Sequence, residues 1–154
     1  MQDALDSVRQ FHIKMGAPIS LSPTLLTCDW TAAAVLAERV GILASETMTA
    51  ASEDDVLLRR ASMVLEEFAE WLAAHAKGDL LVAADAWADR AYVLFGDAVA
   101  AGLPAVALFK EVHRSNITKE PDPSRTGKAI KGAKYQPPDI RKALASNIRT
   151  RPTR

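Results

Sequence analysis

Five acidic residues in the middle of the chain have the type and spacing to do chemistry: Glu66, Glu67, Glu70, Asp85 and Asp89. On a helix, the three glutamates would share one side, and the two aspartates, four residues apart, would share a stripe of another helix. Carboxylate oxygens are the ligands that Mg²⁺ and Mn²⁺ prefer, whereas zinc sites usually contain histidine or cysteine, which both stripes lack. The spacing predicts a magnesium or manganese site if two helices bring the stripes together.

The aspartate pair is unusual because it interrupts an apolar stripe. Its neighbours around the helix are apolar: Leu81, Val82, Tyr92 and Val93. On a helix surface, two such carboxylates repel each other by roughly a few tenths of a kcal/mol, but each unpaired charge costs several kcal/mol in a partly desolvated setting. A divalent cation, a shared proton or an arginine could compensate for this cost. The candidate arginines are Arg59, Arg60 and Arg90.

The glutamates also have a simpler explanation. The opposite side of their helix is apolar: Leu57, Ala61, Leu65, Phe68, Trp71 and Leu72. A charged face opposite an apolar face is typical of an ordinary surface helix, so the glutamates could be a solvated face without chemistry. The sequence alone leaves both interpretations open.

The C-terminal quarter of the chain is basic. Residues 114–154 contain 11 lysines and arginines against 3 acidic residues, whereas residues 1–113 contain 8 against 16. Over residues 118–139, lysines alternate with glycines and prolines without an apolar period, which predicts a loop. Ammonium groups on such a backbone suit phosphate binding, so we predict a phosphate-binding loop at 118–139 and a flexible tail at 149–154. Weak contact of this basic tail with nucleic acid is the alternative.

Helices must position these residues, because alanine and leucine dominate and apolar residues recur at the helical period. We predict five helices, with a short sixth one possible at the C-terminus: Asp3–Lys14, Asp29 or Thr31 to Thr49, Ser52 to His75 or Lys77, Asp79–Ala101, Ala105–Asn116 and the short Asp139–Ile148. Ser52 and Asp55 are spaced like a capping pair. The fold class is therefore all-α, and the short connections predict an antiparallel bundle of about five helices in one domain over residues 1–154.

The bulk composition predicts a cytoplasmic protein. The 154 residues are 49% hydrophobic and 25% charged, which is enough for one domain with its own core. No stretch approaches the roughly 18 apolar residues of a membrane span, and the N-terminus lacks a secretory pattern, so we expect no membrane partner. The single cysteine, Cys28, cannot form an internal disulfide, which agrees with a reducing compartment.

Four stretches of the chain carry a family resemblance: VRQFHIKMGAPI, LEEFAEWLAAHAKGDL, ADAWADRAYVLFG, and EVHRSNITK followed by GKAIKGAKYQPPDI. Together they resemble the MazG-like superfamily of all-α nucleoside triphosphate pyrophosphohydrolases, whose Glu-Glu-x-x-Glu motif matches Glu66, Glu67 and Glu70. The nearest likeness is to the small phosphoribosyl-ATP pyrophosphohydrolase-like branch, which includes dimeric enzymes that act on dUTP.

The chain departs from the superfamily pattern in two places. The second acidic helix often carries Glu-x-x-Asp in the superfamily. Aligned on Asp89, the glutamate position is Ala86 here, and we expect Asp85 to replace the missing glutamate. The segment from Leu21 to Ser52 is also longer than the resemblance leads us to expect, by about one helix.

The resemblance implies cleavage of the α–β phosphoanhydride of a nucleoside triphosphate, which yields a nucleoside monophosphate and pyrophosphate. The role that the resemblance implies for the protein is removal of non-standard or excess nucleotides such as dUTP. The implied cofactor is Mg²⁺, with Mn²⁺ as an alternative. The implied roles are as follows: Glu66, Glu67, Glu70, Asp85 and Asp89 bind metal, the three glutamates are catalytic, Lys119, Lys128 and Lys131 bind phosphates, and Asn116 and Tyr135 contact the sugar or base.

The resemblance also implies a homodimer or a dimer of dimers, and no nucleic-acid partner. Several bulky apolar residues provide more surface than five short helices are expected to bury: Phe11, Trp30, Trp71, Trp87 and Phe95. Two other functions stay open. One is hydrolysis of phosphoribosyl-ATP, and the other is a non-enzymatic helical module whose basic tail binds nucleic acid.

Overall fold

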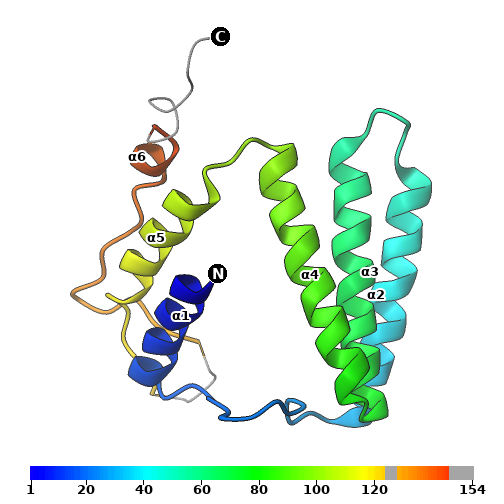
Figure 1. Ribbon diagram of the computed structural model, residues 1–154, viewed down its shortest axis with the longest axis horizontal. Coiled ribbons are helices and arrows are strands. Elements are labelled where there is room, and N and C mark those ends of the chain that lie inside the picture. Colours follow the sequence, from blue (N-terminus) through cyan, green and yellow to red (C-terminus); the bar gives the residue numbers. More distant parts are fainter. Residues whose placement is uncertain (124–127, 146–154) are drawn as a thin grey trace. The chain divides into compact units, whose positions relative to one another are not determined.

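The computed structural model describes residues 1–123 and 128–145, and these residues form six α-helices (Figure 1). The helices are α1 (Gln2–Met15), α2 (Trp30–Ala50), α3 (Val56–Lys77), α4 (Leu80–Ala100), α5 (Ala105–Asn116) and α6 (Ile140–Ala145). The β pairing within the described residues is one isolated antiparallel bridge between Glu120 and Ile130. The predicted all-α helical bundle is confirmed.

The chain divides into two compact units. The central unit is Ser22–Ala101, which contains α2, α3 and α4, and the terminal unit combines Met1–Leu21 with Gly102–Arg154, which contain α1, α5 and α6. The prediction of one domain over residues 1–154 stays a prediction. The expected tail at 149–154 and the last residues of the predicted final helix lie outside the described residues.

Aspartate side chains start the three helices of the central unit. Asp29 accepts a hydrogen bond from the Ala32 N–H at 3.0 Å, and Asp79 accepts from the N–H groups of Leu81 and Val82, both at 3.1 Å. The start of α3 corrects the sequence prediction, because Asp55, not Ser52, is its N-cap. Such caps contribute about 1 kcal/mol each because they satisfy backbone donors that a helix leaves unpaired.

Small residues bring the central helices together, with α3 packed against both α2 and α4 (Figure 1). The buried apolar residues of these helices are mostly alanines: Ala33, Ala37, Ala44, Leu72, Ala74, Ala83, Ala86 and Val93. Gly78 ends α3 with φ 71° and leads directly into Asp79, which folds α4 back antiparallel to α3.

The alanine-rich core leaves larger apolar side chains outside. On α4, Leu81, Tyr92 and Val99 are 83%, 80% and 82% exposed, and their spacing places all three on one side of the helix. On the opposite side of α4 from these residues, Arg60 of α3 donates to Asp97 at 2.7 Å and to the Val93 carbonyl oxygen. One face of α4 is therefore joined to α3, and the opposite face carries an exposed apolar stripe.

The terminal unit is built on α5, which packs against α1 and α6. Lys14 of α1 donates to the carbonyl oxygen of Ile117, and Asp139 caps α6 by accepting from the Lys142 N–H at 2.9 Å. In the part of the chain that the structure describes, no single helix is long and apolar enough to cross a membrane.

Candidate functional site

The acidic residues predicted from the sequence all lie on α3 and α4 of the central unit. Among them, Glu67 is the residue whose pKa is shifted by all four of the others. Burial raises the pKa of Glu67 above its ordinary value, and the negative charges of neighbouring carboxylates raise it further. In decreasing order of effect, these neighbours are Glu70, Asp89, Glu66 and Asp85. The packing of α3 on α4 therefore brings both predicted stripes into one electrostatic cluster, which we call the acidic cluster.

One oxygen of Glu67 has no partner. Its Oε2 atom is buried and accepts no hydrogen bond within the described residues, although the side chain as a whole is only half-buried. A buried carboxylate oxygen usually accepts a hydrogen bond or binds a cation, because leaving it unsatisfied costs free energy. This oxygen therefore has unused capacity to bind a cation.

The aspartates correct the sequence prediction of a desolvated pair. Asp85 and Asp89 are both exposed, because the apolar neighbours Leu81 and Tyr92 are themselves exposed and cover nothing. In the single chain, water therefore screens the two charges, and the expected desolvation cost is absent.

The three candidate arginines bind elsewhere. Arg60 pairs with Asp97, and Arg59 donates to the carbonyl oxygen of Ser52 at 3.2 Å. The guanidinium of Arg90 lies 4.5 Å from the ring centre of Trp71 and 5.0 Å from that of Phe68. Within residues 1–123 and 128–145, neither Asp85 nor Asp89 forms an ion pair. Arginine pairing therefore does not neutralise these two residues, and water is what screens them in the single chain.

The carboxylates are the type of ligand that a hard divalent cation prefers, but their side chains are not arranged around a common point. They supply only oxygen donors, as Mg²⁺ and Mn²⁺ prefer, and Glu67 Oε2 is unpaired. However, no three acidic, histidine or cysteine side chains in the described part of the chain converge closely enough to hold a metal ion. Binding would need rotation of glutamate side chains, and the metal site stays a prediction.

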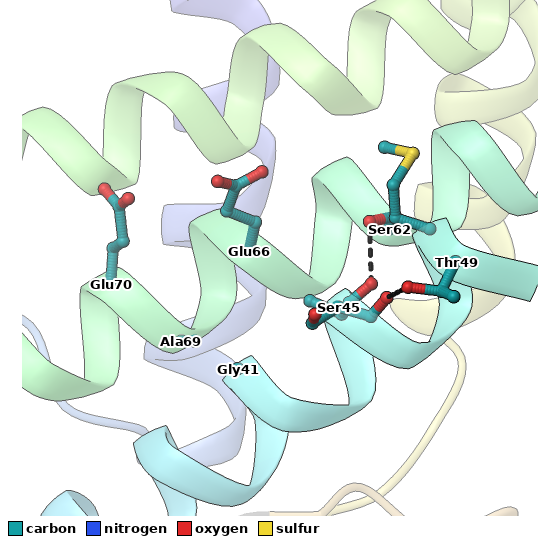
Figure 2. A pocket seen from close by; sticks show the side chains of 9 residues that line it. Gly41, Ser45, Thr49, Ser62, Glu66, Ala69 and Glu70 are labelled. Carbon is teal, nitrogen blue, oxygen red and sulfur yellow. Dashed lines mark hydrogen bonds between the residues drawn. The ribbon is translucent and has the colours of Figure 1, made fainter.

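Two of the glutamates also line a groove. Glu66 and Glu70 lie one turn apart on α3 with their carboxylates pointing the same way, and they border an open groove of about 640 Å³ between α2 and α3 (Figure 2). Glu67 lies 100° further around the helix, toward the acids of α4. The acidic cluster thus has one side at the α3–α4 contact and another at this groove.

The predicted substrate-binding residues belong to the terminal unit, so the structure describes them separately from the acidic cluster. Asn116 ends α5 and borders a small cavity of about 70 Å³ between α1 and α5. The Lys131 Nζ atom lies 5.1 Å from the ring centre of Tyr135, which is a cation–π arrangement. Lys119 is half-buried and Lys128 is exposed. Their roles stay predictions.

A hydrogen-bond network that sequence reasoning missed holds the end of the basic segment. Arg114 donates to both carboxylate oxygens of Glu111, to Gln136 Oε1 at 3.0 Å and to the Pro137 carbonyl oxygen at 2.9 Å. Glu111 also accepts from the Asp139 N–H at 2.6 Å. The hydrogen bond from Arg114, followed by that from Asp139, lowers the pKa of Glu111 to about 2.

Two hydroxyl groups extend this network. Ser115, which is buried, donates to the Gln136 carbonyl oxygen at 2.7 Å, and Thr118 accepts from the Gln136 N–H at 2.9 Å. The stretches EVHRSNITK and YQPPDI are therefore one structural unit that fixes both ends of the basic segment. The signal in the sequence was a polar stripe at positions 111, 114, 115 and 118, which is the spacing of one helix face.

Comparison with known proteins gives one family. The family described as phosphoribosyl-ATP pyrophosphohydrolase matches residues 35–116, which is more than half of the chain. No curated protein and no solved structure matches. The matched region begins inside α2 and includes α3, α4 and α5. The matched region thus includes most of α2, and the expected extra length of the segment from Leu21 to Ser52 stays a prediction.

Replacing Glu67 with glutamine should stabilise the metal-free protein. Because its folded-state pKa is raised, the native state binds this proton more tightly than the unfolded chain does, and wild-type stability falls as pH rises from about 4.5 through the folded-state pKa. In EDTA, we expect Glu67→Gln to raise Tm at neutral pH and to lose this gain near pH 4.5. Glu53→Gln, on the turn before α3, is the control. An equal gain at both pH values would contradict the assignment.

Replacing Arg114 with lysine should raise the pKa of Glu111. Lysine keeps the charge but cannot reproduce the two parallel hydrogen bonds of the guanidinium. A depressed pKa stabilises the fold above pH 4.5, and this contribution is lost as pH falls through about 2. We expect carboxyl NMR titration to give a pKa near 2 for Glu111 in the wild type and a value closer to 4.5 in Arg114→Lys. Identical titration curves would show that the network does not form.

Proposed function

Since the chain belongs to the phosphoribosyl-ATP pyrophosphohydrolase family, a nucleotide pyrophosphohydrolase family of the MazG-like superfamily, we propose that it cleaves nucleoside triphosphates between the α and β phosphates. The products are a nucleoside monophosphate and pyrophosphate. The proposed role is removal of non-standard or excess nucleotides such as dUTP. The observation that carries the proposal is the acidic cluster around Glu67, which has an unpaired oxygen and no compensating arginine within the described residues.

The proposed cofactor is Mg²⁺, with Mn²⁺ as a substitute. The residues that would hold it are those of the acidic cluster: Glu66, Glu67, Glu70, Asp85 and Asp89. When bound, the cation neutralises phosphate charge and lowers the pKa of a water molecule. Glu66 or Glu67 would accept the proton of the attacking water, because a carboxylate on the rigid α3 helix can be positioned as a general base.

The phosphates would be bound by three lysines of the basic segment, Lys119, Lys128 and Lys131. Their positive charges would stabilise the charge that develops on the departing pyrophosphate. Asn116 and Tyr135 are the proposed contacts to sugar or base. The network around Arg114 supports this role of the segment, because it fixes the backbone on either side of these lysines and so lowers the entropy cost of ordering them.

Phosphoribosyl-ATP is the second candidate substrate, and the family match favours it as directly as it favours a nucleoside triphosphate. Both substrates carry the same phosphoanhydride, so the same carboxylates would serve either reaction. A helical module that binds nucleic acid through its basic segment is a third possibility. It predicts salt-sensitive binding of DNA or RNA and no stabilisation by Mg²⁺.

Removal of a cluster carboxylate should abolish turnover. We expect the wild type to release pyrophosphate from at least one nucleoside triphosphate, deoxynucleoside triphosphate or phosphoribosyl-ATP in Mg²⁺ and to lose this activity in excess EDTA. Glu67→Ala and Glu70→Ala should lower kcat at least about a hundredfold while helicity is retained, because each is proposed to hold the cation. Glu53→Ala is the matched control and should keep full activity. Full activity of either cluster variant, or of the wild type in EDTA, would reject the mechanism.

We also propose that the protein forms a homodimer, or a dimer of dimers, that covers the exposed stripe of α4. Leu81, Tyr92 and Val99 form this stripe, and Asp85 lies on the same side of the helix. A large exposed apolar patch is typical of an interaction surface. A second copy of the chain would also desolvate Asp85, so that its charge would be less screened by water and would attract a cation more strongly.

A charge in this stripe should break the dimer. Val99 lies ten residues beyond Asp89, roughly 15 Å along the helix, so Val99→Glu leaves the acidic cluster intact. We expect light scattering after gel filtration to give a dimeric mass for the wild type and a monomeric mass for Val99→Glu. Val106→Glu, at an exposed valine of α5, should remain dimeric. A monomeric wild type, or equal dissociation by both variants, would overturn the proposal.

A further inference from the structure

The groove between α2 and α3 has two chemically different halves. Glu66 and Glu70 form an acidic half at one end, and Ser45, Thr49 and Ser62 form a hydroxyl half at the other (Figure 2). Along α2 the groove runs from Gly41 to Thr49, which is roughly 12 Å of helix. The two halves are continuous, so one ligand can occupy both.

Small residues form the floor of the groove. A Cβ atom added to Gly41 would lie 3.9 Å from the Ala69 side chain, so the two helices meet there with little between them. Ala44 and Ala69 also line the groove, which gives it an apolar floor beneath the polar residues. An apolar floor with polar edges is typical of a site for a small organic group.

The hydroxyl half is rich in hydrogen-bond acceptors. Thr49 donates to the Ser45 carbonyl oxygen at 2.8 Å, and Ser62 donates to the Ala44 carbonyl oxygen at 2.9 Å. Their single protons are used, so each hydroxyl oxygen can only accept from a ligand. The Ser45 hydroxyl lines the groove and makes no hydrogen bond within the described residues, so it can donate as well as accept.

This arrangement suits a sugar better than a base. Sugar hydroxyls donate hydrogen bonds, and sugar carbons can lie on an alanine floor. A base is usually read by stacking on an aromatic ring or by amide groups, and the groove lining contains neither. The remaining wall residue, Met48, is flexible and apolar and contacts different shapes about equally well.

We infer that the hydroxyl half of this groove binds the sugar of the nucleotide substrate, with Ser45, Thr49 and Ser62 as its hydrogen-bonding residues. This inference rests on the proposed function, because it places the phosphates at Glu66 and Glu70 through the bound cation. The groove does not read the base. A preference for one base, such as uracil, must therefore come from residues outside it.

Filling the groove tests the inference. Ser45 is exposed, so Ser45→Leu adds bulk without disturbing the core. We expect Ser45→Leu to raise KM for nucleoside triphosphates about tenfold or more with a smaller change in kcat, and Ser45→Ala to raise KM about fivefold through loss of one hydrogen bond. The increase should be the same for ATP, GTP, CTP and UTP. Thr47→Leu is the matched control, because Thr47 lies on α2 outside the groove and donates to the Leu43 carbonyl oxygen.

The outcomes separate this inference from the proposed function. A wild type that releases no pyrophosphate from any nucleotide overturns both. An active wild type with an unchanged KM in Ser45→Leu overturns only the sugar site. An increase in KM that depends strongly on the base would show that the groove reads the base. A change of oligomeric state would show that the groove binds a second chain. Either result also overturns the inference. Circular dichroism and Tm confirm folding, and Ser45→Ala decides the question if Ser45→Leu does not fold.

Discussion

Repulsion among carboxylates at the contact between α3 and α4 is the constraint on which the proposed chemistry depends. Glu67 is partly buried at this contact, and both the burial and the charges of Glu70 and Asp89 raise its pKa. The nearest arginines do not relieve this repulsion, because Arg60 pairs with Asp97 and Arg90 stacks on aromatic rings. A protein gains no stability from such an arrangement, so a ligand of opposite charge is its most economical explanation.

Close packing of small residues creates both this contact and the neighbouring groove. Alanines at the buried positions of α2, α3 and α4 allow the helices to approach, which brings their acidic side chains together. The same choice of residues leaves the bulky side chains outside, where Tyr92 and Leu81 form an apolar surface beside Asp85. The catalytic and subunit-interface proposals therefore share one structural cause.

The sequence predicted the helices well because their signals are local. Apolar periodicity gave the helical segments, and Asp29 and Asp79 marked two helix starts by capping chemistry. The i,i+3 and i,i+4 spacing also placed the acids correctly on their helices. The exposure of Asp85 and Asp89 was predicted wrongly, because a helical wheel shows the neighbours of a residue but not whether anything covers them.

Contacts between distant residues could not be derived from local patterns. Arg60 and Asp97 are 37 positions apart, and Glu111 and Asp139 are 28 apart, so nothing in either neighbourhood identifies the partner. The groove was missed for the same reason, since its two walls come from different helices. The substrate could not be predicted from such patterns either, because the proposed reaction takes place at a phosphoanhydride that all the candidate substrates share.

A carboxyl NMR titration of Glu67 with and without Mg²⁺ tests most directly whether the acidic cluster binds a divalent cation. In EDTA, we expect the pKa of Glu67 to lie above its ordinary value of 4.5, because burial and neighbouring negative charges disfavour the ionised form. Addition of Mg²⁺ should lower this pKa, because a bound cation favours the ionised form. An ordinary pKa in EDTA, or a raised pKa that Mg²⁺ leaves unchanged, would contradict the claim that this cluster binds a divalent cation.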